Sequence, residues 1–408
     1  MISHKSIYRY IFVLIATIAF LLALPHRAVA DPSNKLTEEE IFYQQSYLML
    51  STKKYKELDQ RFKQYLDLYA RSEITAEELS IKFETFSKTP GLEPRYDEWV
   101  KAYPQSYSAR LARGIYRVTD AWGKRGDQMA QRTTDDQFRG FNETLKDAQS
   151  DLMISITLYA RPVDSYRYLI RISKGLSLGT ERDLLDAALK LDPKAYEVRS
   201  DYFDAITPRW GGDEEMMASF LDESNKSPMS DKNKKKFEGV YYYAMAQQAR
   251  LEKDYKAGSD YFYKYYLTNK IPSVLQWSGQ VASDGDFKDL AFVRFNQLAT
   301  EYPAYPYGFE LRGILYETHL KDIKKAIQDY LTASGLGASW SQNHMGWYYM
   351  MGINVPVDYV KAKHYLDLAA AQGNNTAKEN LVTLKQLLSH SDKTSSTEAK
   401  QPNKSLKR

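Results

Sequence analysis

Apolar and polar residues follow one another along most of the chain with the period of an α-helix. Between residues 55 and 69, apolar side chains recur at steps of three and four residues, which places them on one helical face. This face consists of Tyr55, Leu58, Phe62, Tyr65, Leu66 and Tyr69. No extended stretch alternates with period two between turn signals, as strands do. The pattern therefore predicts an all-α protein.

Two helix starts are marked by the same local device. Thr37 with Glu40, and Thr75 with Glu78, fit the capping box, in which the two side chains satisfy each other's free backbone N–H groups. We therefore expect one helix to begin after Thr37 and another after Thr75.

The chain also resembles itself. Residues 103–116 and 302–316 each begin with Tyr-Pro and continue, ten residues later, with Arg-Gly-Ile and a nearby tyrosine. Proline stops a helix, and a glycine in the following helix lets a neighbouring helix approach closely. Such similarity within one chain is typical of stacked helical repeats. It predicts antiparallel helix pairs stacked as an α-solenoid.

Residues 338–381 resemble one Sel1-like repeat, a branch of the tetratricopeptide-like class. The matching positions are Met345-Gly346, Tyr349, Gly352, Val355-Pro356, Asp358, Lys361-Ala362, Tyr365, Ala369-Ala370 and Gln372-Gly373-Asn374. Asn354 departs from the usual glycine, although asparagine tolerates the left-handed backbone of that turn. The resemblance implies helix pairs in a right-handed superhelix that binds proteins. It also predicts that Gly346 faces Ala369 or Ala370.

The middle of the chain resembles the family catalogued as domain of unknown function 4034. The resemblance is carried by Trp99, Arg113-Gly114 to Asp120-Ala121-Trp122, Arg125-Gly126, Pro208-Arg209-Trp210-Gly211-Gly212, Met216 and Phe220. It implies a bacterial envelope protein and brings no catalytic residue with it. We expect a helical domain resembling this family over residues 31–275 and tetratricopeptide/Sel1-like repeats over 276–388. A polar, disordered tail is expected over 389–408.

The first thirty residues have the anatomy of a secretory signal peptide. Lys5 and Arg9 precede an apolar run over residues 11–24, and Ala28-Val29-Ala30 offers small residues at a cleavage site. The run is short for a membrane-spanning helix. We therefore expect a signal peptide over 1–30, a mature chain beginning at Asp31 without a membrane span, and a periplasmic or secreted location.

Composition and charge limit the kinds of partner that the chain is expected to bind. Cleavage would remove three of the 56 basic residues, leaving 53 against 52 acidic ones, and no basic face is apparent. A nucleic-acid partner is therefore not expected. The chain has no cysteine, so it has neither disulfides nor a lipoprotein anchor. Its 33 tyrosines suit thin layers of paired helices, where a ring can be buried while its hydroxyl stays wet.

Two motifs resemble those of enzyme or metal sites but lack the required context. Residues 175–179 match GxSxG, but a helical segment precedes Ser177, whereas a nucleophile elbow needs a strand there. Asp284-Gly285-Asp286 with Asp289 lacks the sixth-position glycine and the twelfth-position acid of a calcium loop. We interpret the first motif as an interhelical turn and the second as a helix cap.

His344 and His364 could meet on adjacent helices. A zinc site would need a third ligand, and the sequence offers no HExxH motif or cysteine pair. We therefore expect no metal, no cofactor and no catalytic site, and the chain is interpreted as a protein that is not an enzyme.

Tryptophan and arginine are the residues that most often anchor protein interfaces. Trp122 and Arg125 lie three positions apart, so a helix would place them side by side. With Trp210 they are the candidate residues for binding a partner. A tryptophan at helical spacing also suits a core, and the sequence leaves that alternative open for these residues and for Trp277, Trp340 and Trp347.

The preferred function is an exported, protein-binding or scaffolding module of the bacterial envelope. Two alternatives stay open: an immunity protein that neutralises a secreted toxin, and a cell-wall-acting enzyme whose catalytic site is not recognisable. The sequence does not identify the partner or the oligomeric state.

Overall fold

The computed structural model describes residues 36–126 and 132–398, with side chains through residue 389. This part of the chain forms 19 α-helices and no strand, which confirms the all-α prediction. The predicted signal peptide lies outside it. The first helices are α2 (Glu38–Ser51), α3 (Tyr55–Ala70), α4 (Ala76–Phe83), the 3-10 helix η1 (Glu84–Lys88), α5 (Glu93–Ala102), α6 (Tyr107–Arg125), α7 (Asp135–Leu158), α8 (Val163–Leu176), α9 (Glu181–Leu191) and α10 (Tyr196–Ala205). The remaining ones are the 3-10 helix η3 (Pro208–Trp210), α11 (Glu214–Lys226), α12 (Asp231–Leu251), α13 (Tyr255–Asn269), α14 (Pro272–Asp284), α15 (Lys288–Glu301), α16 (Pro306–Thr318), α17 (Ile323–Gly335), α18 (Ser339–Met351), α19 (Tyr359–Ala371) and α20 (Asn375–Glu398).

Both predicted capping boxes are present. The Thr37 and Thr75 hydroxyls accept from the backbone N–H groups of Glu40 and Glu78, and the two glutamate side chains accept from the backbone N–H groups of the threonines. Burial of one apolar stripe per helix then holds these helices in place, because propensity and caps alone stabilise short helices weakly.

The helices before α9 form a compact body. Helix α8 contacts α4, α6 and α7 within it, and α9 and α10 beyond it. One continuous apolar core links α2 to α8, and its largest fully buried members are Phe62, Tyr69, Phe83, Phe86, Tyr96, Trp99 and Tyr168. Many core side chains are aromatic, so a few residues fill the space between thin layers of helices.

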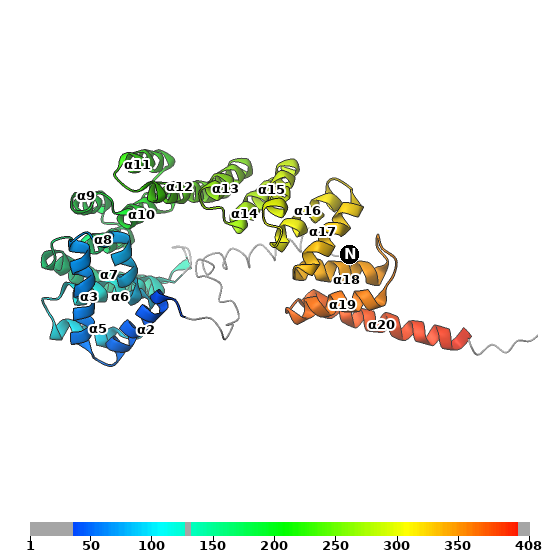
Figure 1. Ribbon diagram of the computed structural model, residues 1–408, viewed down its shortest axis with the longest axis horizontal. Helices are drawn as coiled ribbons and strands as arrows, with labels where there is room; N and C mark the ends of the chain where they lie inside the picture. Colours follow the sequence, from blue (N-terminus) through cyan, green and yellow to red (C-terminus); the bar gives the residue numbers. More distant parts are fainter. Residues whose placement is uncertain (1–35, 127–131, 399–408) are drawn as a thin grey trace, which may run out of the picture.

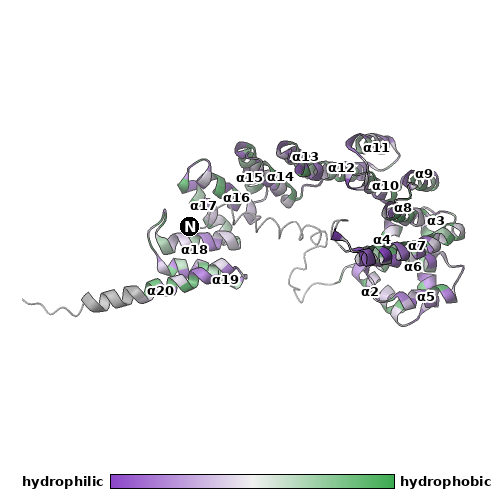
Figure 2. Cartoon of the chain, turned by 180° about the vertical axis from the view of Figure 1, so that it is seen from behind, coloured by the Kyte–Doolittle hydropathy of each residue, from purple (hydrophilic) through white to green (hydrophobic). Residues whose placement is uncertain are grey.

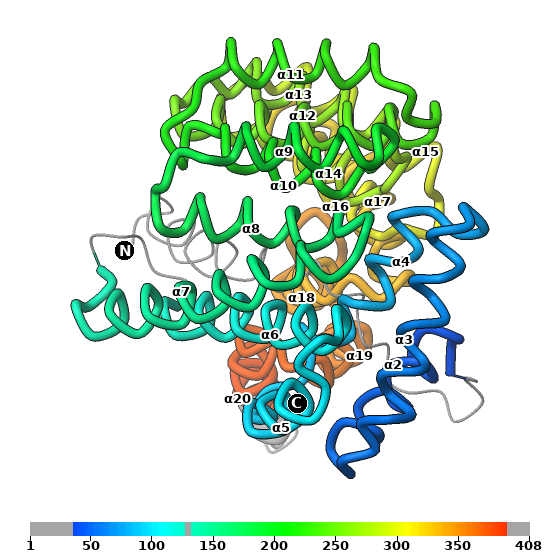
Figure 3. Tube along the Cα trace, turned by 90° about the vertical axis from the view of Figure 1, so that its left-hand side faces the viewer, coloured from blue at the N-terminus to red at the C-terminus, as the bar shows by residue number. Residues whose placement is uncertain are grey.

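From α12 onward the arrangement is linear. Each helix packs mainly on the next one along the chain, and the core divides into small clusters between successive helices. Figure 1 shows these helices following an arc that leads from the compact body to α18–α20. In the end-on view of Figure 3, α9, α11, α12 and α13 project onto one another above α8. Contacts restricted to sequence neighbours define an α-solenoid, as predicted.

The similarity between residues 103–116 and 302–316 reflects one structural unit used twice. In the pair α6–α7, Arg113 holds Asp151 through two nitrogens, at 2.7 and 2.6 Å, and a Cβ on Gly114 would lie 2.7 Å from Leu152. The arginine thus grips the second helix where the glycine lets it approach.

The pair α16–α17 repeats this geometry. Arg312 holds both carboxylate oxygens of Asp329, at 2.9 and 2.8 Å, and a Cβ on Gly313 would lie 2.8 Å from a ring carbon of Tyr330. In both pairs the arginine lies directly before the glycine in the chain. The aspartate that this arginine binds lies directly before the residue that packs against the glycine. The Arg-Gly signature therefore marks a close helix–helix contact.

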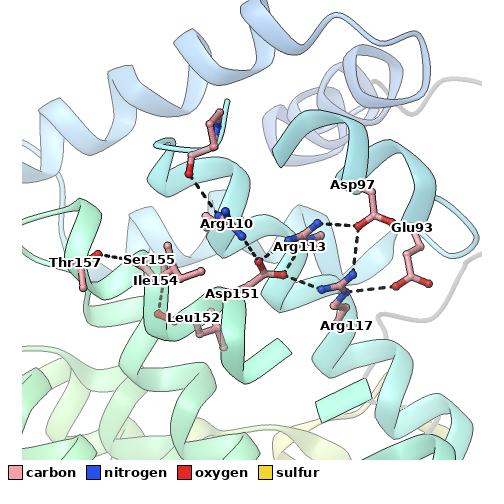
Figure 4. A network of polar contacts seen from close by, with 11 residues as sticks. Glu93, Asp97, Arg110, Arg113, Arg117, Asp151, Leu152, Ile154, Ser155 and Thr157 are labelled. Carbon is pink, nitrogen blue, oxygen red and sulfur yellow. Dashed lines mark hydrogen bonds and ion pairs between the residues drawn. The ribbon is translucent and has the colours of Figure 1, made fainter. Parts of the chain in front are cut away.

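Asp151 is the centre of a larger network in the compact body (Figure 4). Asp151 is only 1% exposed. Its carboxylate accepts hydrogen bonds from three arginines of α6, namely Arg110, Arg113 and Arg117. The more exposed Asp97 and Glu93 of α5 contact the outer side of these arginines. The network ties α5, α6 and α7 together.

The Sel1-like segment forms α18, α19 and the loop between them. Asn354 adopts the left-handed conformation, at φ +58°, which confirms the expectation for that turn. The predicted partner of Gly346 is wrong, however. A Cβ on Gly346 would lie 2.7 Å from Leu366 Cγ and 3.1 Å from the Leu366 backbone nitrogen. Ala369 and Ala370 lie one turn further along α19, and the way the two helices cross decides which turn meets Gly346.

The tail prediction also needs correction. Helix α20 continues to Glu398, well into the range 389–408 that was expected to be disordered. Extending an existing helix costs little compared with starting one, and Ala377 and Leu384 anchor its first half against α18 and α19. Residues 399–408 lie outside the described part.

Hydrophobic and hydrophilic positions are mixed along the helices in Figure 2. Within residues 36–126 and 132–398, no helix is both long and apolar enough to span a membrane.

Candidate functional site

The three predicted binding residues come together. Trp122 and Arg125 lie in the last turn of α6, and Trp210 is the last residue of η3, between α10 and α11. The two indole rings pack edge to face, with their centroids 5.6 Å apart. The Arg125 guanidinium lies 5.5 Å from the Trp122 ring centroid, so the expected helical neighbours do make contact.

A tight turn places Trp210. Pro208 opens η3, where its fixed φ suits a first helical position, and Gly211 closes it at φ +96°. Gly212 approaches the preceding chain so closely that a Cβ there would lie 1.9 Å from the Ile206 carbonyl oxygen. No larger residue fits at Gly212, where the chain that leaves η3 passes back along the end of α10.

Lys174 of α8 lies close to the rings of both tryptophans. Its ammonium lies 5.3 Å from the Trp122 ring centroid and 4.8 Å from that of Trp210, a favourable cation–π arrangement with both rings. It also forms an ion pair with Asp204 of α10. Sequence reasoning missed Lys174 because nothing local links α8 to either tryptophan.

Arg209 was also missed, although its position next to Trp210 in the chain could have indicated it. Its guanidinium lies 5.5 Å from the Trp210 ring centroid. We call the five residues Trp122, Arg125, Lys174, Arg209 and Trp210 the Trp122 patch. It holds three cations, and Asp204 is the one carboxylate of the described chain that forms an ion pair with any of them.

Arg125 is 7% exposed and makes no hydrogen bond or ion pair with any residue in the described ranges. Burial lowers the pKa of its guanidinium, and the nearby positive charge of Arg209 lowers that pKa further. Desolvation and a neighbouring like charge each disfavour the charged form of a cation.

Trp122 is partly core and partly surface, so the two interpretations of the sequence both apply to it. Its ring packs against Phe141 of α7 at 4.8 Å, and a Cβ on Gly175 would lie 3.5 Å from it. Trp210 is also partly exposed and rests on Trp122 and Lys174. Packing against Phe141, Gly175 and Lys174 therefore holds the two rings of the patch in place.

The other tryptophans lie elsewhere. Trp277 packs against Phe262 in the solenoid. Trp340 and Trp347 are 40% and 37% exposed on α18 and flank His344, which stacks on Trp340 with a centroid distance of 4.6 Å. They do not join the patch.

Ser177 does not have the geometry of a nucleophile elbow. It follows the last residue of α8 with a left-handed backbone, φ +54° and ψ +48°, so a helix and not a strand precedes it. The first glycine of the motif has a packing role, because a Cβ on Gly175 would lie 2.7 Å from Leu145 of α7. The motif is an interhelical turn, as interpreted.

Two of the other candidate ligands, Asp289 and His344, each face one acid or imidazole partner. Asp289 faces His319 at 3.0 Å, and the Asp284 to Asp286 stretch forms the turn between α14 and α15. His344 Nε2 lies 3.5 Å from Glu317 Oε2, while His364 is on α19. Within the described residues, no group of three or more histidine and carboxylate side chains is placed to hold a metal ion.

Residues 43–180 match the family described as "Domain of unknown function (DUF4034)". The match is shorter than the region 31–275 expected to resemble it. It ends just after α8 and includes Trp122, Arg125 and Lys174, but not Arg209 or Trp210. No curated protein matches the chain.

Several solved helical-repeat structures align with most of the chain at low identity. A Sel1 repeat protein from Oxalobacter formigenes is 16% identical, with 90% of this chain and 99% of that one covered and a TM-score of 0.34. Yeast Tom70 is 13% identical, with 87% and 89% covered and a TM-score of 0.32. A protective antigen of uropathogenic Escherichia coli with an SLR fold is 12% identical, with 91% and 99% covered and a TM-score of 0.31. Scores this low transfer no detail to this chain. The protein therefore combines a DUF4034-like region over residues 43–180, which holds Trp122 and Arg125, with the helical solenoid that follows it.

Proposed function

We propose that the protein is an exported, periplasmic helical-repeat scaffold that binds another protein through the Trp122 patch. The observation that carries the proposal is the meeting of two partly exposed tryptophans with two arginines that lack a carboxylate partner in the described chain. Tryptophan and arginine dominate the binding energy of protein interfaces, above all where they are held rigidly in desolvated surroundings.

The support beneath the patch agrees with this role. Phe141, Gly175 and Lys174 hold the two rings in place, so little side-chain freedom is lost when a partner binds. A solenoid also presents a long surface made by many successive helices. Such a scaffold binds its partner without a catalytic nucleophile. This agrees with Ser177, which lies in an interhelical turn and does not have the geometry of a nucleophile elbow.

Binding is tested by comparing which envelope proteins are retained by the immobilised mature protein and by a Trp210→Ala variant. Trp210 sits on the surface of the patch, so its loss should leave the fold intact. We expect proteins captured by the wild type to be lost, or reduced about tenfold or more, with Trp210→Ala, since an interface anchor contributes about 2 kcal/mol or more.

Trp347→Ala is the matched control, because Trp347 is an exposed tryptophan on α18, outside the patch. It should capture the same proteins as the wild type. Capture that is insensitive to Trp210→Ala would contradict the proposed binding surface. Equal loss in both variants would point to nonspecific adhesion of exposed tryptophans.

Export rests on the pattern of residues 1–30. We expect protein recovered from the periplasm or the medium to begin at Asp31, because signal peptidase cleaves after small residues such as those of Ala28-Val29-Ala30. Amino-terminal sequencing measures this directly. Protein that keeps Met1 and sediments with membranes would contradict cleavage, while leaving the binding surface untouched.

A further inference from the structure

Asp164, in the first turn of α8, is a buried acid whose charge is not balanced within the described chain. The residue is 4% exposed. One of its carboxylate oxygens accepts a hydrogen bond from the Ser80 hydroxyl of α4. The other oxygen, Oδ2, is buried and has no hydrogen-bond partner in the described ranges. The neighbouring Arg167 of α8 forms its ion pairs with other acids.

The other buried acids of the described residues have the partners that Asp164 lacks. Asp151, Asp192 and Asp329 each accept from at least one arginine. Glu310 accepts from a backbone N–H and a hydroxyl of α18. Asp164 holds the one carboxylate oxygen of the described chain that is buried without a partner. The ionised form of this side chain is therefore costly to bury, and the protonated form much less so.

Two further acids lie close to Asp164 and belong to different helices. Arg167, one turn further along α8, donates to Glu84 of η1 at 3.1 Å, and the same nitrogen lies 3.7 Å from Glu197 of α10. Ser80, which binds Asp164, lies one turn before Glu84, so the two acids are about one helical turn apart on facing segments. The Arg167 Nη1 atom is buried without a partner, so no hydrogen bond from Arg167 reaches Asp164.

These surroundings decide the charge of Asp164. Burial raises the pKa of Asp164 from its ordinary value of 3.8 to about 6. Arg167 and Ser80 offset only part of this rise, whereas Glu84 and Glu197 add to it. The first turn of a helix favours an anion, but Oδ2 accepts no backbone N–H there. Asp164 therefore changes its charge in mildly acid solution.

The other titratable groups around Asp164 act in the same direction or keep their charge. Burial also raises the pKa of Glu197, although Arg167 and Lys236 oppose this rise. Burial alone would raise the pKa of Asp201, but Arg171 and Arg167 lower it, so this acid stays ionised. The remaining titratable side chains that interact with Asp164 are neutral tyrosines whose pKa values burial raises, namely Tyr69 of α3, Tyr107 of α6 and Tyr168 of α8.

We infer that Asp164 makes the junction of α8 with α4 and α10 pH-sensitive, so that the compact body holds α10 more firmly in mildly acid than in neutral solution. A carboxyl whose pKa is raised by folding stabilises the folded junction at low pH, and this stabilisation is lost as the pH rises through about 6. Helix α10 leads into the solenoid (Figure 1). The Trp122 patch lies across the same junction, because Lys174 belongs to α8 and Trp210 follows α10. The pH dependence itself is independent of the proposed function.

The test is amide hydrogen exchange of the mature full-length protein, measured by mass spectrometry at about pH 5 and about pH 7.5. Protection of α8 and α10 is compared after correction for the intrinsic exchange rates at each pH. We expect α10 of the wild type to be about tenfold better protected at the lower pH, the ratio that pKa values of 3.8 and about 6 give. Peptides from α18 and α19, at the far end of the solenoid, are the internal reference.

Asp164→Asn keeps the shape of the side chain and the acceptor for Ser80, but it cannot ionise. In this variant α10 should be better protected than in the wild type at neutral pH, and most of the pH dependence should be lost. Asp97→Asn is the matched control, because it neutralises an exposed acid of α5 and should keep the wild-type pH dependence. Ser80→Ala removes a hydrogen bond that favours the ionised form of Asp164. It should shift the midpoint of the pH dependence to higher pH.

Three results overturn the inference. The first is a wild-type α10 that is no better protected in acid than in neutral solution. The second is a pH dependence that survives in Asp164→Asn. The third is weaker protection of Asp164→Asn than of the wild type at both pH values, because the ionised carboxylate would then stabilise the junction. If Asp164→Asn does not fold, Ser80→Ala decides: a midpoint at higher pH supports the inference, and an unchanged midpoint overturns it.

Discussion

Replacing Asp151 with alanine is expected to lower the free energy of unfolding by about 3–5 kcal/mol, because it removes the one anion at the centre of three arginines. The carboxylate is buried and accepts from Arg110, Arg113 and Arg117 at 2.6 to 3.0 Å. Without it, three partly buried arginines of α6 would lie side by side at the α6–α7 contact without the carboxylate that they share (Figure 4). Urea unfolding followed by circular dichroism measures the change.

Asp97→Ala is the control for this prediction. Asp97 contacts two of the same arginines, but its side chain is 49% exposed, so water and salt screen the interaction. We expect a loss of about 1 kcal/mol or less. If the two variants were equally stable, Asp151 would not hold the network together, and the Arg-Gly signature would mark a packing contact only.

Gly346→Leu is expected to destabilise the protein by about 1–3 kcal/mol, because a side chain has no room where α18 meets α19. A Cβ alone would lie 2.7 Å from Leu366 Cγ and 3.1 Å from the Leu366 backbone nitrogen. The Leu366 side chain could rotate away from the new Cβ, but the α19 backbone at Leu366 would have to move. Removing a helical glycine recovers about 1 kcal/mol at most, so the net change stays unfavourable. Thermal melts followed by circular dichroism measure the change.

Gly335→Leu provides the matched comparison. Gly335 is the exposed last residue of α17, and nothing lies within 4 Å of where its Cβ would be. Its replacement should leave the melting temperature unchanged or raise it slightly. A Gly346→Leu variant as stable as Gly335→Leu would mean that α18 and α19 do not approach as closely as described.

The candidate site was predicted in part. Trp122 and Arg125 were expected to be neighbours because three residues along a helix face the same side, and they are in contact. Trp210 was selected for its residue type, and the fold brought it to Trp122. Lys174 carried no signal of its own. It belongs to the patch because α8 runs past both tryptophans, which no local pattern could indicate.

The sequence by itself determined that the protein is all-α and where several of its helices begin or end. Capping boxes, apolar periodicity and Tyr-Pro stops act over a few residues, so they can be recognised without the rest of the molecule. The repeated Arg-Gly signature also predicted a close helix contact, which appears twice, with Asp151 and with Asp329.

Tertiary structure alone decided which side chains meet across helices. Gly346 was assigned to the correct face of α19 but to the wrong turn, because Leu366 and Ala369 lie on one face three residues apart. The choice between turns depends on how far one helix slides along the other, which the loop and the surrounding packing set. The same rule governs the Trp122 patch, where α6, α8 and η3 are brought together by crossing angles that no short stretch of sequence encodes.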